Sequence, residues 1–235
     1  MDASEKNVVI EVLRGRSASY RMLARLFFKP LNEEDIENMV SIDLCARALE
    51  LEGTGLLSEG FNDMGRALRK RHTGTRSQLG TDFTMCFDGM EAVGDLVAVP
   101  YASVFLGTEA LFYQEPRHEV YKIFQAEGVG VKSGIDLPED HITFELEFLA
   151  LLSDRAVTAL ENDQHDEALR NLRISREFIE DSILTWIGLL AARAEKILKT
   201  RFYRGALKAT QGYLDLDAQT ITDLVEEIRD SGGDT

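Results

Sequence analysis

Asp140 and His141 are the side chains of this chain that are best placed to do chemistry. They follow Pro138 and stand directly before the apolar run ITFELEFLALL, where a buried helix is predicted to begin. Because residues four apart share one face of a helix, Glu145 lies in the same row as His141. The sequence therefore places two acids and an imidazole at one helix start, a combination that is able to cap a helix, bind a metal, transfer protons or recognise a cation.

The capping role and the enzymatic roles require different additional residues. Acids are favoured at a helix N-terminus, and His141 would then be a semi-buried histidine bonded to Glu145. A metal site needs a third or fourth ligand, yet the other histidines are scattered and show no HExxH spacing. Ser103 and Ser153 lack the GxSxG context of a hydrolase nucleophile. The enzyme alternative is thus a helical metal-dependent hydrolase that uses Asp140, His141 and Glu145.

Recognition of a partner is the remaining role. A carboxylate takes a guanidinium group in bidentate fashion, so an acid and an imidazole beside exposed aromatic side chains suit an Arg-rich peptide. Apolar neighbours would hold a helical peptide in a groove. The residues by themselves do not choose between the helix cap and this recognition site.

The composition sets limits on the class of protein. The chain has 235 residues, of which 44% are hydrophobic and 29% charged, which fits one large or two small soluble domains. A formal net charge of -15 argues against nucleic acid as a partner, because phosphates attract Lys and Arg. The same charge favours a cationic partner such as a basic peptide, or serves only solubility.

Targeting and cofactor signals are missing from the sequence. No apolar stretch marks a signal peptide near the N-terminus, and no window approaches the roughly 20 apolar residues that span a bilayer. Cys45 and Cys86 lie in apolar surroundings, which predicts buried free thiols in a reducing compartment. GVGVKSG does not match the GxxxxGK[ST] phosphate loop, and we predict no bound cofactor. A cytoplasmic protein without direct membrane insertion is expected.

Helical periodicity runs through almost the whole chain, and the fold class that we predict is all-α. Asn32 is predicted to be an N-cap, and Asp136 another one that forms a variant capping box with Glu139. The polar segment from His72 to Gly80 is predicted to be a loop. Helices are predicted over residues 9–28, 36–44 and 56–68, from near Pro100, from Pro116, and over 138–161, 165–199 (kinked or divided) and 202–229.

We expect a single domain, 1–235, made of two helical halves. The stretch EGVGVKSGIDLP has three glycines and ends in proline, which predicts a hinge at about residues 125–137. Residues 230–235 are predicted to be a disordered tail. The run Arg69-Lys70-Arg71 ends a predicted helix, where cations face the negative end of the macrodipole, so it is interpreted as structural rather than as a nucleic-acid patch.

Several segments in this order resemble one known family, the TorD/DmsD/NarJ group of redox-enzyme maturation chaperones. PEDHITFELEFLALL with PYASVFLG upstream is similar to the signature of the group, and Tyr20 to Pro30 is similar to its opening helix, Y-x-x-L-A-x-L-F-x-x-P. DFTMCFDG resembles the D-[YF]-x-x-L-F-x-G element, with Cys86 where leucine is usual. FIEDSILTWIGLLAARAEK and RFYRGALKATQGYLDLD resemble the closing helices, with Asp181 where a histidine is common. The resemblance covers about residues 8–217.

The resemblance implies an all-helical cytoplasmic chaperone of anaerobic respiration, not an enzyme. Its partners would be the catalytic subunit of a molybdenum oxidoreductase and the twin-arginine signal peptide of that subunit. The chaperone holds the client back from export until the molybdopterin guanine dinucleotide cofactor is inserted. Monomers and homodimers, including domain-swapped dimers that exchange halves through the hinge, are implied as well.

The resemblance also implies which residues bind the peptide. Asp140 would contact a guanidinium group and His141 would shape the site, while the aromatic groups between residues 83 and 105 would line an apolar groove. The peptide-binding positions are Asp140 and His141 of the P-x-D-H motif, Tyr101 and Ser103 of P-Y-x-S, and Phe83, Phe87 and Gly89 of D-F-x-x-x-F-x-G, together with Glu145 from the helix row.

Overall fold

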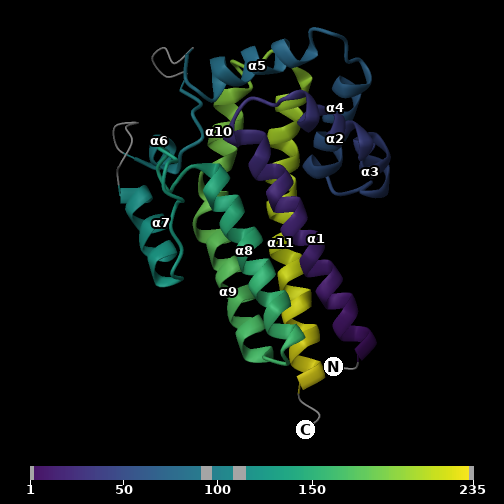
Figure 1. Cartoon of the computed structure of the whole chain (residues 1–235), viewed down its shortest axis with the longest axis vertical. Helices are drawn as coiled ribbons and strands as arrows, with labels where there is room; N and C mark the ends of the chain where they lie inside the picture. Colours follow the sequence, from purple (N-terminus) through teal and green to yellow (C-terminus); the bar gives the residue numbers. More distant parts are fainter. Residues whose placement is uncertain (1–2, 91–96, 108–114, 233–235) are drawn as a thin grey trace.

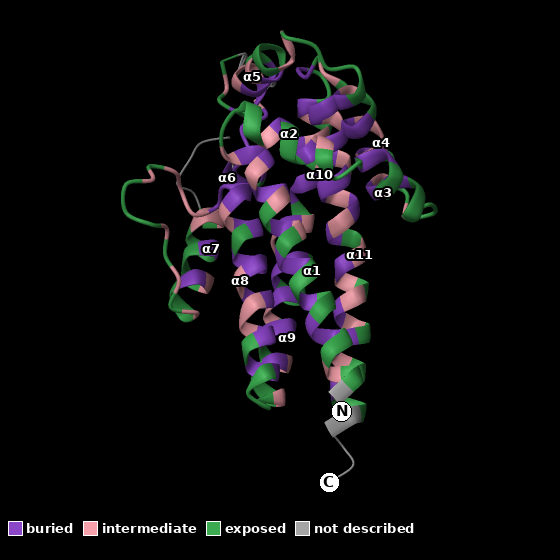
Figure 2. Cartoon of the chain, turned by 45° about the vertical axis from the view of Figure 1, so that its right-hand side comes forward, coloured by how far each residue is buried: buried purple, intermediate pink, exposed green. Residues whose placement is uncertain are grey.

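Four long helices form the body of the molecule. The computed structural model describes residues 3–90, 97–107 and 115–232. In it the long helices lie side by side, and the first and last of them bring the two ends of the chain to the same end of the bundle (Figure 1). Buried residues are concentrated on the inward faces of these helices (Figure 2). The four helices are α1 (Ala3–Phe28), α8 (Ile142–Glu161), α9 (His165–Asp181) and α11 (Arg201–Gly232).

Shorter helices cover the other end and one flank of this bundle. The helices α2 to α5 surround the N-terminal half of α11, and α6 and α7 lie beside α8 (Figure 1). None of the described helices is long and apolar enough to cross a membrane. The shorter helices are α2 (Glu33–Ser41), α3 (Leu44–Glu50), α4 (Leu56–Arg69), α5 (Thr75–Cys86), α6 (Ala102–Leu106), α7 (Glu115–Ala126), the 3-10 turn Ile183–Thr185 and α10 (Ile187–Ala194).

The predicted all-α class is confirmed, since the described ranges hold helices and a single isolated β-bridge but no strand. The predicted N-cap at Asn32 is confirmed, with a complete capping box to Asp35. The helix predicted over 165–199 is indeed divided, into α9, the 3-10 turn and α10.

Two local predictions are wrong. The predicted loop from His72 to Gly80 belongs largely to α5, because the Thr75 hydroxyl accepts the His72 N–H at 2.8 Å at the helix start. The polar residues of this segment face solvent, and a polar composition is also typical of a loop. The capping box predicted for Asp136 and Glu139 does not form, since α8 starts only at Ile142.

The predicted hinge lies between α7 and α8. This connection is irregular, and Gly128 and Gly134 take φ values of 64° and 92°, which glycine adopts at no steric cost. Movement about the hinge stays a prediction. Of the tail predicted to be disordered, residues 230–232 are part of α11, and residues 233–235 lie outside the described residues.

Candidate functional site

The segments that carry P-Y-x-S and P-x-D-H meet in the structure, although 37 residues separate Ser103 from Asp140. Tyr101 and His141 form an antiparallel bridge. The Ala102 N–H donates to the Asp140 carbonyl at 3.0 Å, and the Ile142 N–H donates to the Pro100 carbonyl at 2.9 Å. The start of α6 is therefore fixed against the start of α8, and the two motifs form one site.

Asp140 caps a helix, but not the helix that follows it in the chain. Its carboxylate oxygen Oδ2 accepts the Ser103 N–H in the first turn of α6 at 2.9 Å. The side chain is fully buried, and burial raises the pKa of Asp140, while the nearby Ser103 hydroxyl and the Ser103 N–H oppose this shift. Capping is thus part of what Asp140 does, and it ties α6 to α8.

His141 is the N-cap of α8. Its Nδ1 accepts the Thr143 N–H at 3.2 Å, so the neutral ring carries its proton on Nε2. The ring packs edge-on against Tyr101, with the ring centroids 4.7 Å apart. Burial lowers the pKa of His141 to about 3. The imidazole is therefore neutral at physiological pH, and it shapes the site by packing and by hydrogen bonding.

Glu145 lies one turn further along α8 and is completely buried. Neither of its carboxyl oxygens has a hydrogen-bond partner, and Oδ1 of Asp140 has none either. Burial and then the charge of Asp140 raise the pKa of Glu145 well above its ordinary value, which favours the neutral form of its carboxyl. The indole N–H of Trp186 lies close enough to oppose this rise in the pKa of Glu145, but it does not form a hydrogen bond. Two acids with three unsatisfied oxygens thus face one another inside the protein, which is costly and calls for a partner.

Replacing Glu145 by glutamine is expected to stabilise the protein increasingly as the pH rises. A glutamate that is neutral when folded and ionised when unfolded stabilises the fold below the unfolded pKa, and this contribution is lost as the pH rises through the folded pKa. Glutamine does not ionise, so the variant gains up to about 1.4 kcal/mol of unfolding free energy over wild type for each pH unit in this range. Urea unfolding at a series of pH values between 4 and 8 measures the difference.

The control for this experiment is Glu161→Gln, at the exposed end of the same helix, where the side chain makes only an exposed ion pair with Arg14, which is expected to contribute no more than about 1 kcal/mol. His141 gives a slope of the opposite sign, because a buried neutral imidazole loses stability as the pH falls from about 6.5 toward 3. A difference between Glu145→Gln and wild type that does not grow with pH would show that Glu145 is not held neutral.

Three of the predicted peptide-binding positions lie in a different environment. Phe83 and Phe87 are buried, and each packs against Tyr203 with ring centroids 5.9 and 5.5 Å apart. Gly89 follows α5 with a φ of 76°, a conformation that favours glycine. In this structure these residues of D-F-x-x-x-F-x-G build the core and a turn, and their role in peptide binding stays a prediction.

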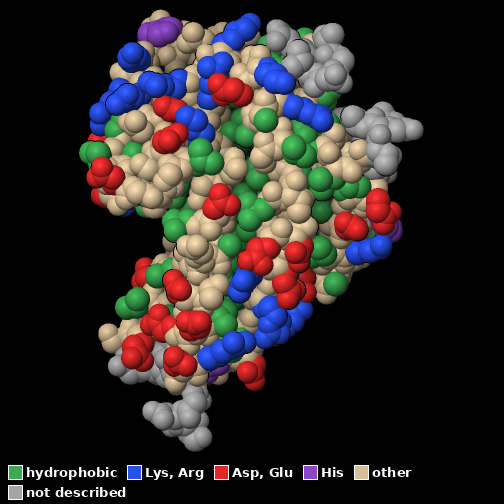
Figure 3. Space-filling model, turned by 180° about the vertical axis from the view of Figure 1, so that it is seen from behind, with side chains coloured by type: hydrophobic (Ala, Val, Ile, Leu, Met, Phe, Trp, Pro, Cys, Tyr) green, Lys and Arg blue, Asp and Glu red, His purple; other side chains and the backbone are tan. Residues whose placement is uncertain are grey.

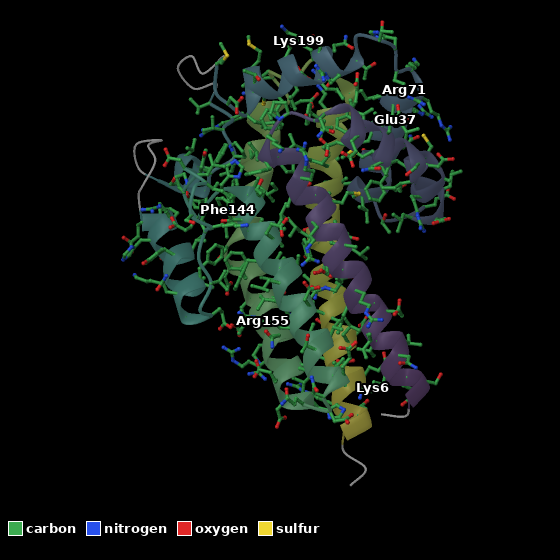
Figure 4. The ribbon with its side chains drawn as sticks, in the orientation of Figure 1. Lys6, Glu37, Arg71, Phe144, Arg155 and Lys199 are labelled. Atoms are coloured by element: carbon green, nitrogen blue, oxygen red, sulfur yellow. The ribbon has the colours of Figure 1, made fainter. Side chains whose placement is uncertain are left out.

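A cavity of about 310 Å³ lies next to the site, lined mainly by apolar side chains and also by Arg21, Lys132 and Glu147. The hinge segment and α7 form one wall through Phe124, Val129 and Ile135, and α8 forms the other through Phe144 and Phe148. Phe144 lies on the side of α8 that faces α7 (Figure 4), and its ring centroid is 6.1 Å from that of His141. The acids of the site and this cavity are therefore neighbours along α8.

An arginine of the chain itself already binds at the edge of the site. Arg117 of α7 donates from Nε to Glu139 at 2.8 Å, and its charge opposes the rise that burial causes in the pKa of Asp140. The loop before α8 thus attracts a guanidinium group in the protein as it stands. Glu127, at the start of the hinge, similarly accepts from Arg155 and Arg170 and fastens α7 to α8 and α9.

Metal chemistry finds no support in this geometry. Within the described ranges, no group of three or more His, Cys, Asp or Glu side chains is arranged to hold a metal ion, and this includes Asp140, His141 and Glu145. The hydrolase alternative therefore lacks its metal centre in the part of the chain that the structure describes.

Sequence reasoning missed two residues that matter here. Trp186 is fully buried and faces Glu145, and a single Trp in an apolar run was the only available signal. Asp82 accepts the backbone N–H groups of Lys199 and Thr200 at 2.8 and 2.7 Å, which explains the acid that opens DFTMCFDG. It caps α11, and no local pattern reveals a partner that lies more than a hundred residues away.

Relatives of the chain align with it along most of its length. A chaperone protein TorD of Vibrio cholerae serotype O1 is 27% identical over 212 residues, which cover 90% of this chain and 94% of the relative. One from Vibrio vulnificus is 28% identical over 206 residues, covering 86% and 93%. One from Photobacterium profundum is 24% identical over 205 residues, covering 86% and 92%. The alignments therefore extend over nearly the whole of each protein.

The family model described as nitrate reductase delta subunit matches residues 55–192. This match covers more than half of the chain, and it includes both α6 and α8 and hence the whole Asp140 site. The chain therefore belongs to the nitrate reductase delta subunit family, the TorD/NarJ-type family that its motifs resemble.

Proposed function

We propose that this protein is a cytoplasmic chaperone that binds the twin-arginine signal peptide of a molybdoenzyme catalytic subunit before export and assists insertion of the cofactor. The observation that carries the peptide site is the group of three buried carboxylate oxygens without a donor, on Asp140 and Glu145. A guanidinium group supplies up to five N–H donors in a planar fork, and no other side chain satisfies two facing acids so completely.

The proposed site is closed in the structure and opens when the peptide binds. Its cover is the start of α6, held by the Ser103–Asp140 hydrogen bond and by Phe105, which stacks on Trp186 with ring centroids 5.6 Å apart. An arginine of the peptide displaces the Ser103 N–H from Asp140 and reaches Glu145 behind it. Binding of the cation then ionises Glu145, so affinity rises with pH and a proton is released.

The cavity beside the Asp140 site suits the apolar part of the peptide. The cavity between α8 and the hinge segment is lined by Phe124, Phe144 and Phe148, and it accepts the hydrophobic residues that follow. The hinge at about residues 125–137 forms part of the wall, and its movement admits the peptide. The same movement provides a route to a homodimer in which two copies exchange halves.

Asp140→Asn is expected to weaken binding of a twin-arginine peptide by at least about tenfold, because a buried ion pair is reduced to a neutral contact. Glu145→Gln is expected to weaken it too and to remove the proton release. Isothermal titration calorimetry in two buffers of different ionisation enthalpy measures both the affinity and the proton count. A Lys-Lys peptide tests the guanidinium geometry, since an ammonium group does not bind in bidentate fashion.

The matched control is Asp136→Asn, which removes the same charge from an exposed carboxylate four residues earlier. It is expected to leave the affinity unchanged. Thermal melting of each variant checks that α6 stays docked. Equal affinity of wild type and a folded Asp140→Asn variant would refute the assignment of Asp140 to the guanidinium group.

A further inference from the structure

Two segments of this acidic chain are strongly basic, and the fold brings them together. Residues 64–81 contain five Lys or Arg residues and residues 196–214 contain another five, and neither segment contains an Asp or Glu. The whole chain has 41 acids against 26 Lys and Arg. Figure 3 shows Lys and Arg side chains gathered at the end of the molecule where α4 ends and α11 begins. These two segments are thus a local excess of positive charge in an acidic chain.

A hollow of about 720 Å³ lies between these two segments, and we call it the basic hollow. Its rim carries Lys70 and His72 from the end of α4, and Lys199 and Arg201 from the start of α11. Lys70 and Lys199 are exposed and have no ion-pair partner among the residues that the structure describes. Lys199 lies at the outer end of the molecule in Figure 4. These two cations are therefore available to a partner.

The floor of the basic hollow is apolar and does not suit a small phosphate ligand. Leu68, Leu79 and Phe202 line it and are buried, and Ala67 lines it as well. The backbone N–H groups that precede α11 would be the natural anchor for a phosphate, but Asp82 already accepts two of them. The carboxylate of Asp82 also repels a second anion at that place.

We propose that the basic hollow binds an acidic segment of a polypeptide partner. Carboxylates spaced along such a segment reach the separate cations of the rim, while an apolar residue between them covers Leu68 and Leu79. The remaining surface carries the excess of acids and repels the segment, so that it is steered to this end. The proposal rests on the residues of the basic hollow and does not depend on the peptide site at Asp140.

The test is binding of a fluorescein-labelled peptide made of three Glu-Asp-Leu-Glu repeats, followed by fluorescence anisotropy at low and moderate salt. We expect binding to weaken with salt, and the double variant Lys70→Glu/Lys199→Glu to lose about tenfold or more in affinity. A peptide of Gln-Asn-Leu-Gln repeats is expected not to bind. A twin-arginine peptide is expected to bind the double variant as it binds wild type, which separates this site from the one at Asp140.

The matched control is Lys6→Glu/Lys122→Glu, which changes the net charge equally at two lysines away from the basic hollow, each paired with an exposed acid. It is expected to keep the affinity for the acidic peptide. Equal loss in both double variants would overturn the proposal, because long-range repulsion alone would explain it. Displacement of the peptide by inorganic phosphate, but not by chloride at equal ionic strength, would overturn it in favour of a phosphate ligand. Self-association that Lys70→Glu/Lys199→Glu abolishes would overturn it in favour of a second copy of this chain.

Discussion

Asp217→Ala is expected to destabilise the protein by about 3–5 kcal/mol, because it leaves a buried guanidinium group without its counter-charge. Asp217 on α11 and Arg16 on α1 are both almost fully buried, with side chains 1% and 3% exposed. Arg16 donates from Nε and Nη2 to the two carboxylate oxygens at 2.6 and 2.8 Å. The Tyr20 hydroxyl donates to the same carboxylate at 2.6 Å, and Arg16 reaches Ser153 of α8 at 3.0 Å. The carboxylate thus joins α11 to α1, and Arg16 extends the network to α8.

The loss of unfolding free energy in Asp217→Ala is measured by urea unfolding. Two further variants serve as comparisons. Asp154→Ala removes the partner of Arg21 from a pair whose side chains are 42% and 49% exposed, and it is expected to cost no more than about 1 kcal/mol. Arg16→Met/Asp217→Leu removes both buried charges and is expected to lose less than Asp217→Ala alone. If Asp217→Ala costs no more than Asp154→Ala, the buried pair is not part of what holds α1, α8 and α11 together.

The helices of this fold were predictable from sequence, but the contacts that build its sites were not. Apolar periodicity marks α1 and α8 because each buries one face along its whole length. The pairing of Arg16 with Asp217 joins residues 201 positions apart, and no local pattern encodes it. The start of α5 was missed for a related reason: its first turn is exposed and polar, which is also the composition of a loop.

The candidate site was predictable in its residues and not in its geometry. The motif order selected Asp140, His141, Tyr101 and Ser103, and the bridge between Tyr101 and His141 does bring them together. The helix that Asp140 caps is α6, which lies earlier in the chain, so the local rule that assigned this acid to the helix after it gave the wrong partner. The basic hollow shows the same limit, because each of its two segments looks like a solvated helix end until the fold joins them.

Gly212→Ala is expected to destabilise the protein by about 3 kcal/mol or more, because α4 and α11 touch at their backbones. A Cβ atom at Gly212 would lie 2.3 Å from the backbone nitrogen of Leu57 and 2.9 Å from the carbonyl carbon of Leu56. At Gly60 a Cβ would lie 2.3 Å from the backbone nitrogen of Ala209, so α4 and α11 approach each other closely at a second point. Backbone atoms cannot rotate away as a side chain can, and the two helices must separate.

The control for Gly212→Ala is Gly15→Ala, in the exposed middle of α1, where a Cβ meets no atom within 4 Å. Since alanine favours a helix more than glycine does, Gly15→Ala is expected to stabilise the protein by about 0.5–1 kcal/mol. The two variants add the same methyl group to two helices, so opposite signs in urea unfolding isolate the close approach of α4 and α11. An unchanged free energy of unfolding in Gly212→Ala would contradict the backbone contact between α4 and α11.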